Sequence, residues 1–364
     1  MGLHDLYPMQ ILAIETSCDE TALALIEAKG GLKKPSFKVL ENLVSSQIKI
    51  HRPFGGVVPN LAKREHLKNL PILMGKILKI SNFQFPISKQ ILISKSKTLD
   101  TIDLIAVTVG PGLEPCLWTG VNFAKEVYKQ LQTKNYKLKT KLIGGNHLEG
   151  HLSSFLLSHK KPVKFPAVAL IVSGGHTILL KMDSLVKWKK IGETRDDAVG
   201  EAFDKVARLL GLPYPGGPEI EKLAKKGNGN SIEFPRPMLT HKNYDFSFAG
   251  LKTSVLYFLR DNPKTKKADI AASFQNAAID VLVKKTLRAA DEFGAETIIL
   301  GGGVAANRYL KSHLSKEAKQ IGVKFLVPKG EFNTDNAAMV ATSSYINHLK
   351  KKKYRLIAQG NLSM

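Results

Sequence analysis

The chain has 364 residues and a mass of 40.0 kDa, which is enough for two domains of ordinary size, each with its own core. An apolar fraction of 43%, a mean hydropathy of -0.09 and the lack of a long apolar run are typical of a soluble protein, so we expect a cytoplasmic protein with no membrane partner. The 54 Lys and Arg against 31 Asp and Glu give a net charge of +23, which indicates a polyanionic partner such as a nucleic acid.

The two cysteines, Cys18 and Cys116, are far apart in the sequence, so neither a disulfide framework nor a zinc ribbon is expected. Reduced thiols fit a cytoplasmic protein. The lysines form short groups spread along the chain, at 33–34, 187–190, 264–267 and 350–353. This spread favours a broad phosphate-facing surface over a single recognition helix.

The first element in chain order is a predicted hairpin over residues 11–26, with two apolar runs on either side of a polar turn at 15–21. The turn carries hydroxyls and carboxylates. The same pattern returns at residues 167–180, where the turn at 173–177 is small and polar. The repeat predicts a duplicated α/β domain, with one loop from each half directed at a shared cleft.

The remaining signals predict two mixed α/β halves. They are a strand at 104–109, helices at 117–131, 198–210 and 274–292, a strand at 296–300 and a last helix at about 336–352. Segments rich in Lys or Ser, at 81–100 and 132–141, are expected to be solvated connections.

His147 and His151 stand four positions apart in the run Asn-His-Leu-Glu-Gly-His-Leu. In a helix their imidazoles lie on one face and can hold one metal ion, although the same pair can be two ordinary helix histidines. A zinc protease is disfavoured, because Leu148 stands where the general base would be and Glu149 points away from the pair.

Carboxylates provide a third ligand for such a metal. Asp196 and Asp335 each precede a predicted helix, where an Asp often caps the first turn, and we assign Asp196 to that role. Asp335 lies in the run Asn-Thr-Asp-Asn, which is richer in ligands than a cap requires. Two imidazoles and one carboxylate suit Fe, Zn or Mn and leave room for a substrate oxygen.

Glycine clusters at 174–175, 216–217 and 301–303 follow strands or precede helices. Glycine lets backbone N–H groups approach a phosphate closely, although turns also need glycine. None of the clusters has P-loop or Rossmann spacing. They therefore favour an ATP-type fold in which two domains share the nucleotide.

Taken together, these residues resemble the bacterial TsaD family, which is related to the archaeal and eukaryotic Kae-type and the Qri-type proteins. The resemblance covers nearly the whole chain and rests on motifs that occur in the family's order, at 15–21, 55–59, 146–151, 172–177, 200–204 with 215–218, 245–253, 301–307 and 333–336. The Ser-Cys-Asp-Glu form of the first turn is most similar to the bacterial and mitochondrial branch.

The resemblance implies an actin, sugar-kinase and heat-shock ATPase-like α/β fold, with two ribonuclease-H-like lobes around a nucleotide cleft. The expected lobes are residues 1–145 and 146–335, the second carrying the metal and adenylate site, with a helix at about 336–358 packing back on the first.

The resemblance also assigns roles to residues. His147, His151 and Asp335 match the ligands of one divalent metal, with Fe2+ preferred over Zn2+ or Mg2+. Asp19 and Glu20 match acidic residues that are important for activity. The positions that match the adenylate or ATP-type nucleotide site, with Glu221 as a further contact, are Ile171, Val172, Ser173, Gly174, Gly175, Asp204, Gly217, Glu221 and Asn307.

The implied activity is transfer of a threonylcarbamoyl group from threonylcarbamoyl-AMP to N6 of an adenosine next to the anticodon, in tRNAs that read codons beginning with A, with release of AMP. The implied partners are tRNA, a TsaB-type paralogue and a TsaE-type ATPase. Arg52 and Ala249 depart from the family pattern and put surface contacts with partner proteins in question.

Two functions of other classes stay open. A small-molecule kinase of the same superfamily would use Mg2+ held by carboxylates and has no use for the His147/His151 pair. A non-catalytic tRNA-binding scaffold would keep its function after both histidines are replaced.

Overall fold

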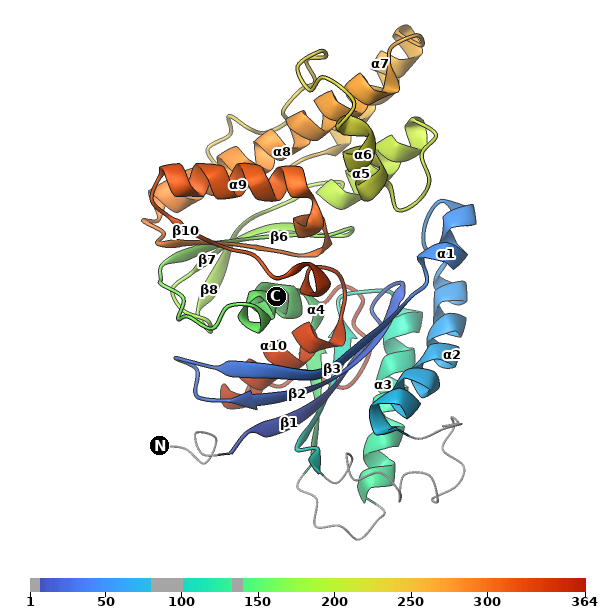
Figure 1. Cartoon of the computed structure of the whole chain (residues 1–364), viewed down its shortest axis with the longest axis vertical. Helices are drawn as coiled ribbons and strands as arrows, with labels where there is room; N and C mark the ends of the chain where they lie inside the picture. The colour runs from blue at the N-terminus through green and yellow to red at the C-terminus, as the bar shows by residue number, and fades with distance from the viewer. Residues whose placement is uncertain (1–6, 80–100, 133–139) are drawn as a thin grey trace. The chain divides into compact units, whose positions relative to one another are not determined.

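A computed structural model describes residues 7–79, 101–132 and 140–364 (Figure 1). The chain divides into two compact units. Unit 1 comprises Met1–Ile50, Val57–Pro162 and Asp335–Met364, and unit 2 comprises His51–Gly56 and Val163–Thr334. The sequence predicts a boundary between two lobes at residues 145 and 146. In the structure, unit 1 extends to Pro162 and also includes the C-terminal residues from Asp335.

The sheet of unit 1 has five strands in the order β3-β2-β1-β4-β5. They are β1 (Met9–Glu15), β2 (Glu20–Lys29), β3 (Ser36–Ser46), β4 (Leu104–Gly110) and β5 (Lys141–Asn146). The pairs β1–β2 and β2–β3 are antiparallel, while β1–β4 and β4–β5 are parallel. The first hairpin is therefore present, and its polar turn joins β1 to β2.

Both faces of this sheet are covered by helices, which are α2 (Pro59–Leu78), α3 (Glu114–Gln132), α4 (His147–Ser153) and α10 (Ala337–Leu349). The short helix α1 (Ile48–His51) follows β3. Along β1, Leu12 and Ile14 belong to the core that α2 and α3 complete. Ile11 and Ala13 alternate with them along the strand and are fully buried, so they belong to the opposite face of the sheet. Helix α10 packs against β1 (Figure 1). The near-continuous apolar sequence of β1 follows from this double cover.

Unit 2 repeats the sheet of unit 1. Its order is β8-β7-β6-β9-β10, and its strands are β6 (Ala167–Val172), β7 (Thr177–Met182), β8 (Trp188–Glu193), β9 (Thr297–Gly301) and β10 (Lys324–Leu326). The pairs β6–β7 and β7–β8 are antiparallel, and β6–β9 and β9–β10 are parallel. Each strand thus has a counterpart in unit 1, as the repeated hairpin pattern predicts.

The helices of unit 2 are α5 (Val199–Leu209), α6 (Gly216–Ala224), α7 (Ala249–Asp261), α8 (Lys267–Glu292) and α9 (Arg308–Gln320). The long helix α8 supplies the centre of the core, where Phe274 and Leu282 are fully buried with Val168 and Leu170 of β6. Short 3-10 turns at Arg52–Phe54, Ser154–Leu157, Gly303–Ala306 and Gly330–Phe332 complete the described elements.

Two sequence predictions concern residues that are not described. The connection at 81–100 lies outside the described residues, as do residues 133–139 of the one at 132–141. Among the helices of the described ranges, none has the length and apolar character needed to cross a membrane.

Candidate metal centre and nucleotide site

The two histidines of unit 1 lie on α4, which begins where β5 ends. The side chain of Asn146 caps the helix, because its Oδ1 accepts hydrogen bonds from the backbone N–H groups of Leu148 at 2.9 Å and Glu149 at 3.2 Å. The rings of His147 and His151 stand edge to face, with centroids 4.6 Å apart. The cap thus starts a helix on which both imidazoles face the same side.

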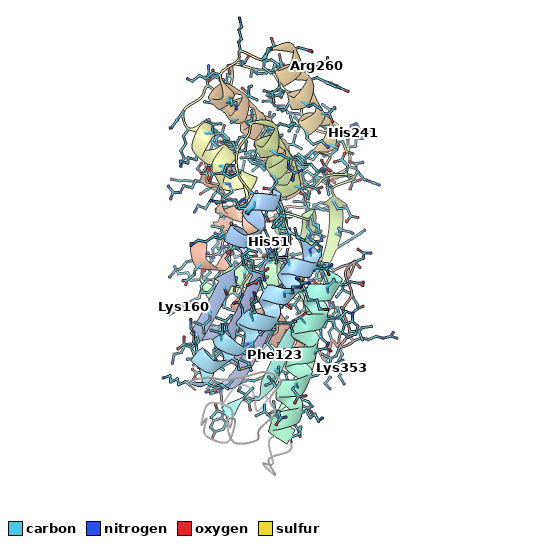
Figure 2. The ribbon with its side chains drawn as sticks, turned by 90° about the vertical axis from the view of Figure 1, so that its right-hand side faces the viewer. His51, Phe123, Lys160, His241, Arg260 and Lys353 are labelled. Carbon is cyan, nitrogen blue, oxygen red and sulfur yellow. The ribbon has the colours of Figure 1, made fainter. Side chains whose placement is uncertain are left out.

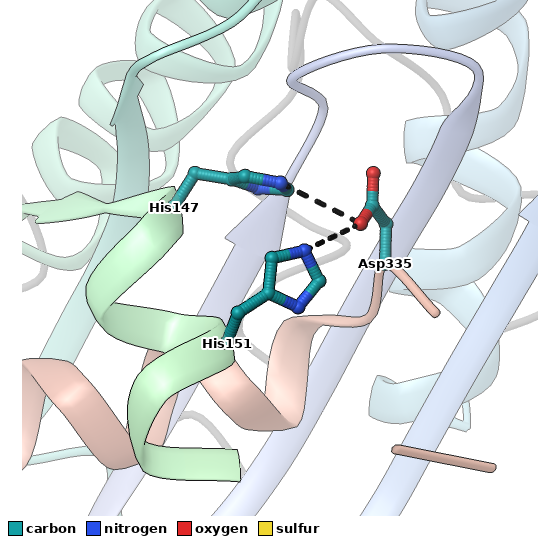
Figure 3. A group of neighbouring side chains, drawn as sticks. All are labelled: His147, His151 and Asp335. Atoms are coloured by element: carbon teal, nitrogen blue, oxygen red, sulfur yellow. Dashed lines mark ion pairs between the residues drawn. The ribbon is translucent and has the colours of Figure 1, made fainter. Parts of the chain in front are cut away.

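Asp335 brings a carboxylate to these rings from the far end of the sequence (Figure 3). Its Oδ1 lies 3.5 Å from Nε2 of His147 and 3.1 Å from Nε2 of His151. The capping role at α10 belongs to Asn336, whose side chain accepts from the N–H of Met339 at 3.0 Å. One ligand atom from each of the three residues lies within 4.8 Å of the others.

The opposite nitrogen of the His147 ring is held by a buried carboxylate. Nδ1 lies 3.1 Å from Oε2 of Glu15 and 3.1 Å from Oγ of Ser17. Glu15 also accepts from Thr108 Oγ1 at 2.6 Å. A carboxylate that accepts a hydrogen bond from Nδ1 fixes the ring orientation of a metal-binding histidine. It also leaves Nε2 with the lone pair that a metal needs. Glu15 is not among the residues predicted for the site.

The buried charges of this group shift one another's pKa values. Burial alone would lower the pKa of His147, but the carboxylates of Asp335 and Glu15 raise it to about 9. Burial alone would raise the pKa of Glu15, and His147 holds it below its usual value instead. Burial and the neighbouring His147 lower the pKa of His151, despite the nearby Asp335. One imidazole is thus basic and the other favours its neutral form.

The residues present fit a divalent metal. Both ring nitrogens of His151 are buried. Nδ1 makes no hydrogen bond within the described part of the chain, and Nε2 lies 3.1 Å from the same Oδ1 of Asp335 that Nε2 of His147 approaches. Buried polar atoms nearly always have a partner, and two imidazole nitrogens that converge on one carboxylate oxygen fit the donor set of a metal ion. Two nitrogen donors and one oxygen donor leave further coordination positions open.

Asp19 and Glu20 lie at the β1–β2 turn of the same unit, and Asp19 is buried. Burial, Asp19 and Asp335 together raise the pKa of Glu20 well above its usual value. The negative charge of Asp335 is thus one of the causes that raise the pKa of Glu20. His66 supports the turn, since its Nε2 lies 2.9 Å from the carbonyl oxygen of Cys18.

In unit 2, the predicted nucleotide residues begin at the end of β6 with Ile171 and Val172. Ser173 opens the turn to β7, and its N–H donates to the carbonyl oxygen of His176 at 2.8 Å. The space where a Cβ would stand at Gly174 and Gly175 is open. The backbone of this turn can therefore be approached closely by a ligand.

Helices α5 and α6 lie next to this turn. A Cβ at Gly200 would stand 2.5 Å from the carbonyl oxygen of Ser173, so the first turn of α5 packs tightly on it. Further along α5, Asp204 accepts from the N–H of Gly216 at 2.7 Å and so holds the start of α6. Gly217 follows there with open space around it.

The remaining two residues meet at the start of α9. Glu221 of α6 accepts from the N–H of Arg308 at 3.1 Å. Asn307 caps α9 by accepting from the N–H of Leu310 at 2.9 Å, and its Nδ2 donates to Gln275 at 3.1 Å. Through these contacts the predicted nucleotide residues of unit 2 form one connected group beside the carboxyl ends of β6 and β9.

One structural expectation needs correction. Asp196 does cap a helix, but the helix is α7, where it accepts from the N–H groups of Phe248 at 2.8 Å and Ala249 at 3.2 Å, since these lie at the start of that helix. Glu149 contacts neither histidine ring and is buried among polar side chains of unit 1.

Comparison with known proteins agrees with the family predicted from the motifs. The model of the TsaD family, described as tRNA N6-adenosine threonylcarbamoyltransferase, matches residues 38–342. A protein of that name from Thermosipho africanus is 47% identical over 343 residues, which cover 93% of this chain and 94% of the relative. One from Geobacter metallireducens is 44% identical over 337 residues, covering 92% and 90%.

Solved structures support the fold. Full-length HypF, crystallised in a phosphate- and nucleotide-bound form, superposes with a TM-score of 0.57 at 13% identity and covers 96% of this chain. HypF of T. kodakarensis gives 0.56 at 15% identity and 95% coverage. The chain spans 56% and 48% of these two proteins. The likeness confirms the predicted α/β fold of the actin, sugar-kinase and heat-shock ATPase class.

The match to the family model extends over most of the chain, and the relatives align over nearly their whole length. It includes the segments that carry His147, His151 and Asp335 and those that form the glycine turns of unit 2. The chain therefore belongs to the TsaD family of tRNA N6-adenosine threonylcarbamoyltransferases.

Proposed function

We propose that this chain transfers a threonylcarbamoyl group from threonylcarbamoyl-AMP to N6 of the adenosine next to the anticodon, in tRNAs that read codons beginning with A. The bond between the carbamoyl carbon and the phosphate oxygen breaks, a bond from that carbon to N6 forms, and AMP and one proton leave. The observation that carries the proposal is the group formed by buried His147, buried His151 and half-buried Asp335 in a chain of this family.

His147, His151 and Asp335 would hold one divalent metal, Fe2+ by preference, with Zn2+ or Mg2+ as alternatives. When bound, the ion supplies positive charge that polarises carbonyl or phosphoryl oxygens of the substrate. Glu15 keeps the ring of His147 in place through Nδ1, so the ligand geometry is set before the ion arrives.

The AMP part of the substrate would bind in unit 2. The open turn at Gly174 and Gly175 offers backbone N–H groups to the phosphate, as does the start of α6 at Gly217. Asp204 and Asn307 are held by hydrogen bonds within the unit, so their remaining polar atoms are oriented for a nucleoside. Ile171, Val172, Ser173 and Glu221 complete this proposed set.

Asp19 and Glu20 would orient the attacking amine and accept its proton. The N6 amine of adenosine is weakly basic, so the transfer depends on orienting it and on accepting its proton as the new bond forms. A raised pKa makes the ionised carboxylate of Glu20 a stronger base than an ordinary glutamate.

The net charge of +23 suits tRNA as the polyanionic substrate. Exposed cationic side chains occur on both units, as Lys160 and Lys353 of unit 1 and Arg260 of unit 2 illustrate (Figure 2). We further propose that the protein works in the cytoplasm with a TsaB-type paralogue and a TsaE-type ATPase.

Reconstitution tests this function. The purified chain is incubated with threonylcarbamoyl-AMP and a tRNA that reads codons beginning with A, with and without the two partner proteins, and threonylcarbamoyladenosine and AMP are quantified. We expect both products in equal amounts, together with one bound metal per chain. Absence of the modified nucleoside in every arm would contradict the proposal.

The same preparation separates the alternatives. A small-molecule kinase would transfer the γ-phosphoryl group of ATP to a metabolite without tRNA. A tRNA-binding scaffold would bind tRNA and support modification by its partners as well after His147→Ala and His151→Ala as before.

A further inference from the structure

Glu149 lies on α4 between the two histidines and is nearly fully buried, with 7% of its surface exposed. Its carboxylate accepts three hydrogen bonds. Oε2 accepts from Nδ2 of Asn347 at 2.6 Å, and Oε1 accepts from Nζ of Lys352 at 2.6 Å and from the hydroxyl of Tyr354 at 2.8 Å. All three donors come from about 200 residues further along the chain.

The segment that follows α10 contacts the histidine helix at a second point. Nδ2 of Asn146, the cap of α4, donates to the carbonyl oxygen of Ser363 at 3.0 Å. The segment is held in turn by backbone hydrogen bonds, from Gln359 N–H to Val109 at 2.8 Å and from Gly112 N–H to Gly360 at 3.1 Å. Residues 350–364 therefore form hydrogen bonds with both Asn146, which caps α4, and Glu149, in the middle of the helix.

These contacts matter because α4 has only seven residues. A helix of two turns is unstable by itself, so tertiary contacts must set its position. One side of α4 presents the imidazoles to Asp335, and Glu149 holds the other side. An ionised carboxylate that accepts from an ammonium, a hydroxyl and an amide is among the stronger anchors available in a protein interior.

The same carboxylate joins the two elements that carry the ligands. His147 and His151 are on α4, while Asp335 directly precedes the capping residue of α10. Asn347 is on α10, so its hydrogen bond to Glu149 ties the helix of the imidazoles to the helix beside the carboxylate ligand. This bond therefore links the helix that carries the nitrogen donors to the helix next to the oxygen donor.

We propose that Glu149 is the positioning residue of the metal centre, and that Asn347, Lys352 and Tyr354 act through it to set the distance between the histidine pair and Asp335. The inference rests on the metal centre proposed above. It differs from a purely structural role, which would lower the stability of unit 1 and leave metal affinity unchanged.

Two tyrosines of unit 1 provide a matched pair for the test. Tyr354→Phe removes the hydroxyl that donates to Glu149. Tyr345→Phe removes a hydroxyl on α10 that donates to the carbonyl oxygen of Gly30 at 2.7 Å, away from α4. Each change deletes a tyrosine hydroxyl, and loss of the hydrogen bond named here costs about 1 kcal/mol of stability in either place. Glu149→Gln is the stronger variant on the same anchor.

The experiment is a Zn2+ titration of the full-length metal-free protein against a chromophoric chelator, with thermal unfolding measured in parallel. We expect Tyr354→Phe and Glu149→Gln to weaken Zn2+ binding about 10- to 100-fold, the usual effect of residues that support a ligand, and Tyr345→Phe to leave it unchanged. Unaltered Zn2+ affinity in Tyr354→Phe and Glu149→Gln would overturn the positioning role.

An equal loss of affinity in Tyr345→Phe would also overturn the inference, because the effect would then follow stability and not the anchor. The proposed metal centre is tested separately by His151→Ala. If the unaltered chain and His151→Ala bind Zn2+ equally, the metal centre is wrong and the positioning role falls with it.

Discussion

The two hairpins, β1–β2 of unit 1 and β6–β7 of unit 2, occupy the same place in sheets of the same strand order, yet their turns differ in chemistry. The first turn carries Asp19 and Glu20, in the field of Asp335. The second has Gly174 and Gly175, with open space at both positions. A duplicated scaffold thus presents carboxylates in one copy, which suit cations and protons, and bare backbone in the other, which suits a phosphate.

Buried charge is also used differently in the two units. In unit 1 the buried carboxylate of Glu15 lies beside His147, which faces His151. In unit 2, Lys285 of α8 is fully buried, and its ammonium donates to the carbonyl oxygens of Asn243 at 3.3 Å and Asp245. The charge of Lys285 holds a backbone segment in place, whereas His147 and His151 belong to the metal centre that we propose.

The strongest test of this contrast removes the ligands of unit 1. We expect the double change His147→Ala and His151→Ala to abolish metal binding. The rate of threonylcarbamoyl transfer should fall by at least about 10³-fold, because a bound ion stabilises the charge that develops in the transition state by several kcal/mol. AMP affinity, which we assign to unit 2, should stay within a few-fold. Metal content and single-turnover rates measure the effect, with His241→Ala at an exposed position as the control.

The acidic turn is tested by Asp19→Asn and Glu20→Gln. We expect each to lower the single-turnover rate about 10²-fold, because general-base assistance is lost while the side-chain volume is kept. Metal and AMP affinities should change little. A variant with a normal rate would remove that carboxylate from the proposed proton transfer.

The buried charge of Lys285 in unit 2 can be tested through the pH dependence of the free energy of unfolding. Burial and the neighbouring Arg288 lower its pKa from 10.5 to about 8. Between pH 8 and pH 10.5 the unfolded chain binds one more proton at this lysine than the folded chain does. The free energy of unfolding therefore increases as the pH rises from 8 to 10.5. This added stability is lost again as the pH falls through 8.

We expect the free energy of unfolding to increase by at most about 3 kcal/mol over this pH range, and we expect no such increase in Lys285→Met. Urea unfolding of both proteins at pH 7 and pH 10 gives the comparison, and other titrating groups cancel in the difference. The same pH dependence in Lys285→Met would show that the pKa of this lysine is not lowered.

The smallest expected effect concerns the glycine turn. Gly174→Ala adds a methyl group into open space, so AMP affinity should change little. Gly174→Asp adds a negative charge beside the proposed phosphate position and should weaken AMP binding by about 1–2 kcal/mol, roughly 10-fold. Calorimetry at two salt concentrations measures this. Equal affinities of the Ala and Asp variants would place the phosphate elsewhere.

Much of the fold could be predicted because its signals are local. Buried strands such as β1, β4 and β6 have continuous apolar runs, and both hairpins are marked by the polar residues between such runs. Elements without this pattern were not predicted. Strand β8 is lysine-rich at the edge of its sheet, and α2 carries Pro71 in its interior.

The candidate site divides in the same way. The sequence alone determined that His147 and His151 share a helix face and that glycines follow β6 and β9, because both depend on neighbours within a few residues. Only the tertiary structure decided that Glu15 orients His147, that Asp196 caps α7 and that Glu149 is anchored by Tyr354. These pairs are separated by 52 to 205 residues, and their meeting depends on how whole elements pack, which no local periodicity encodes.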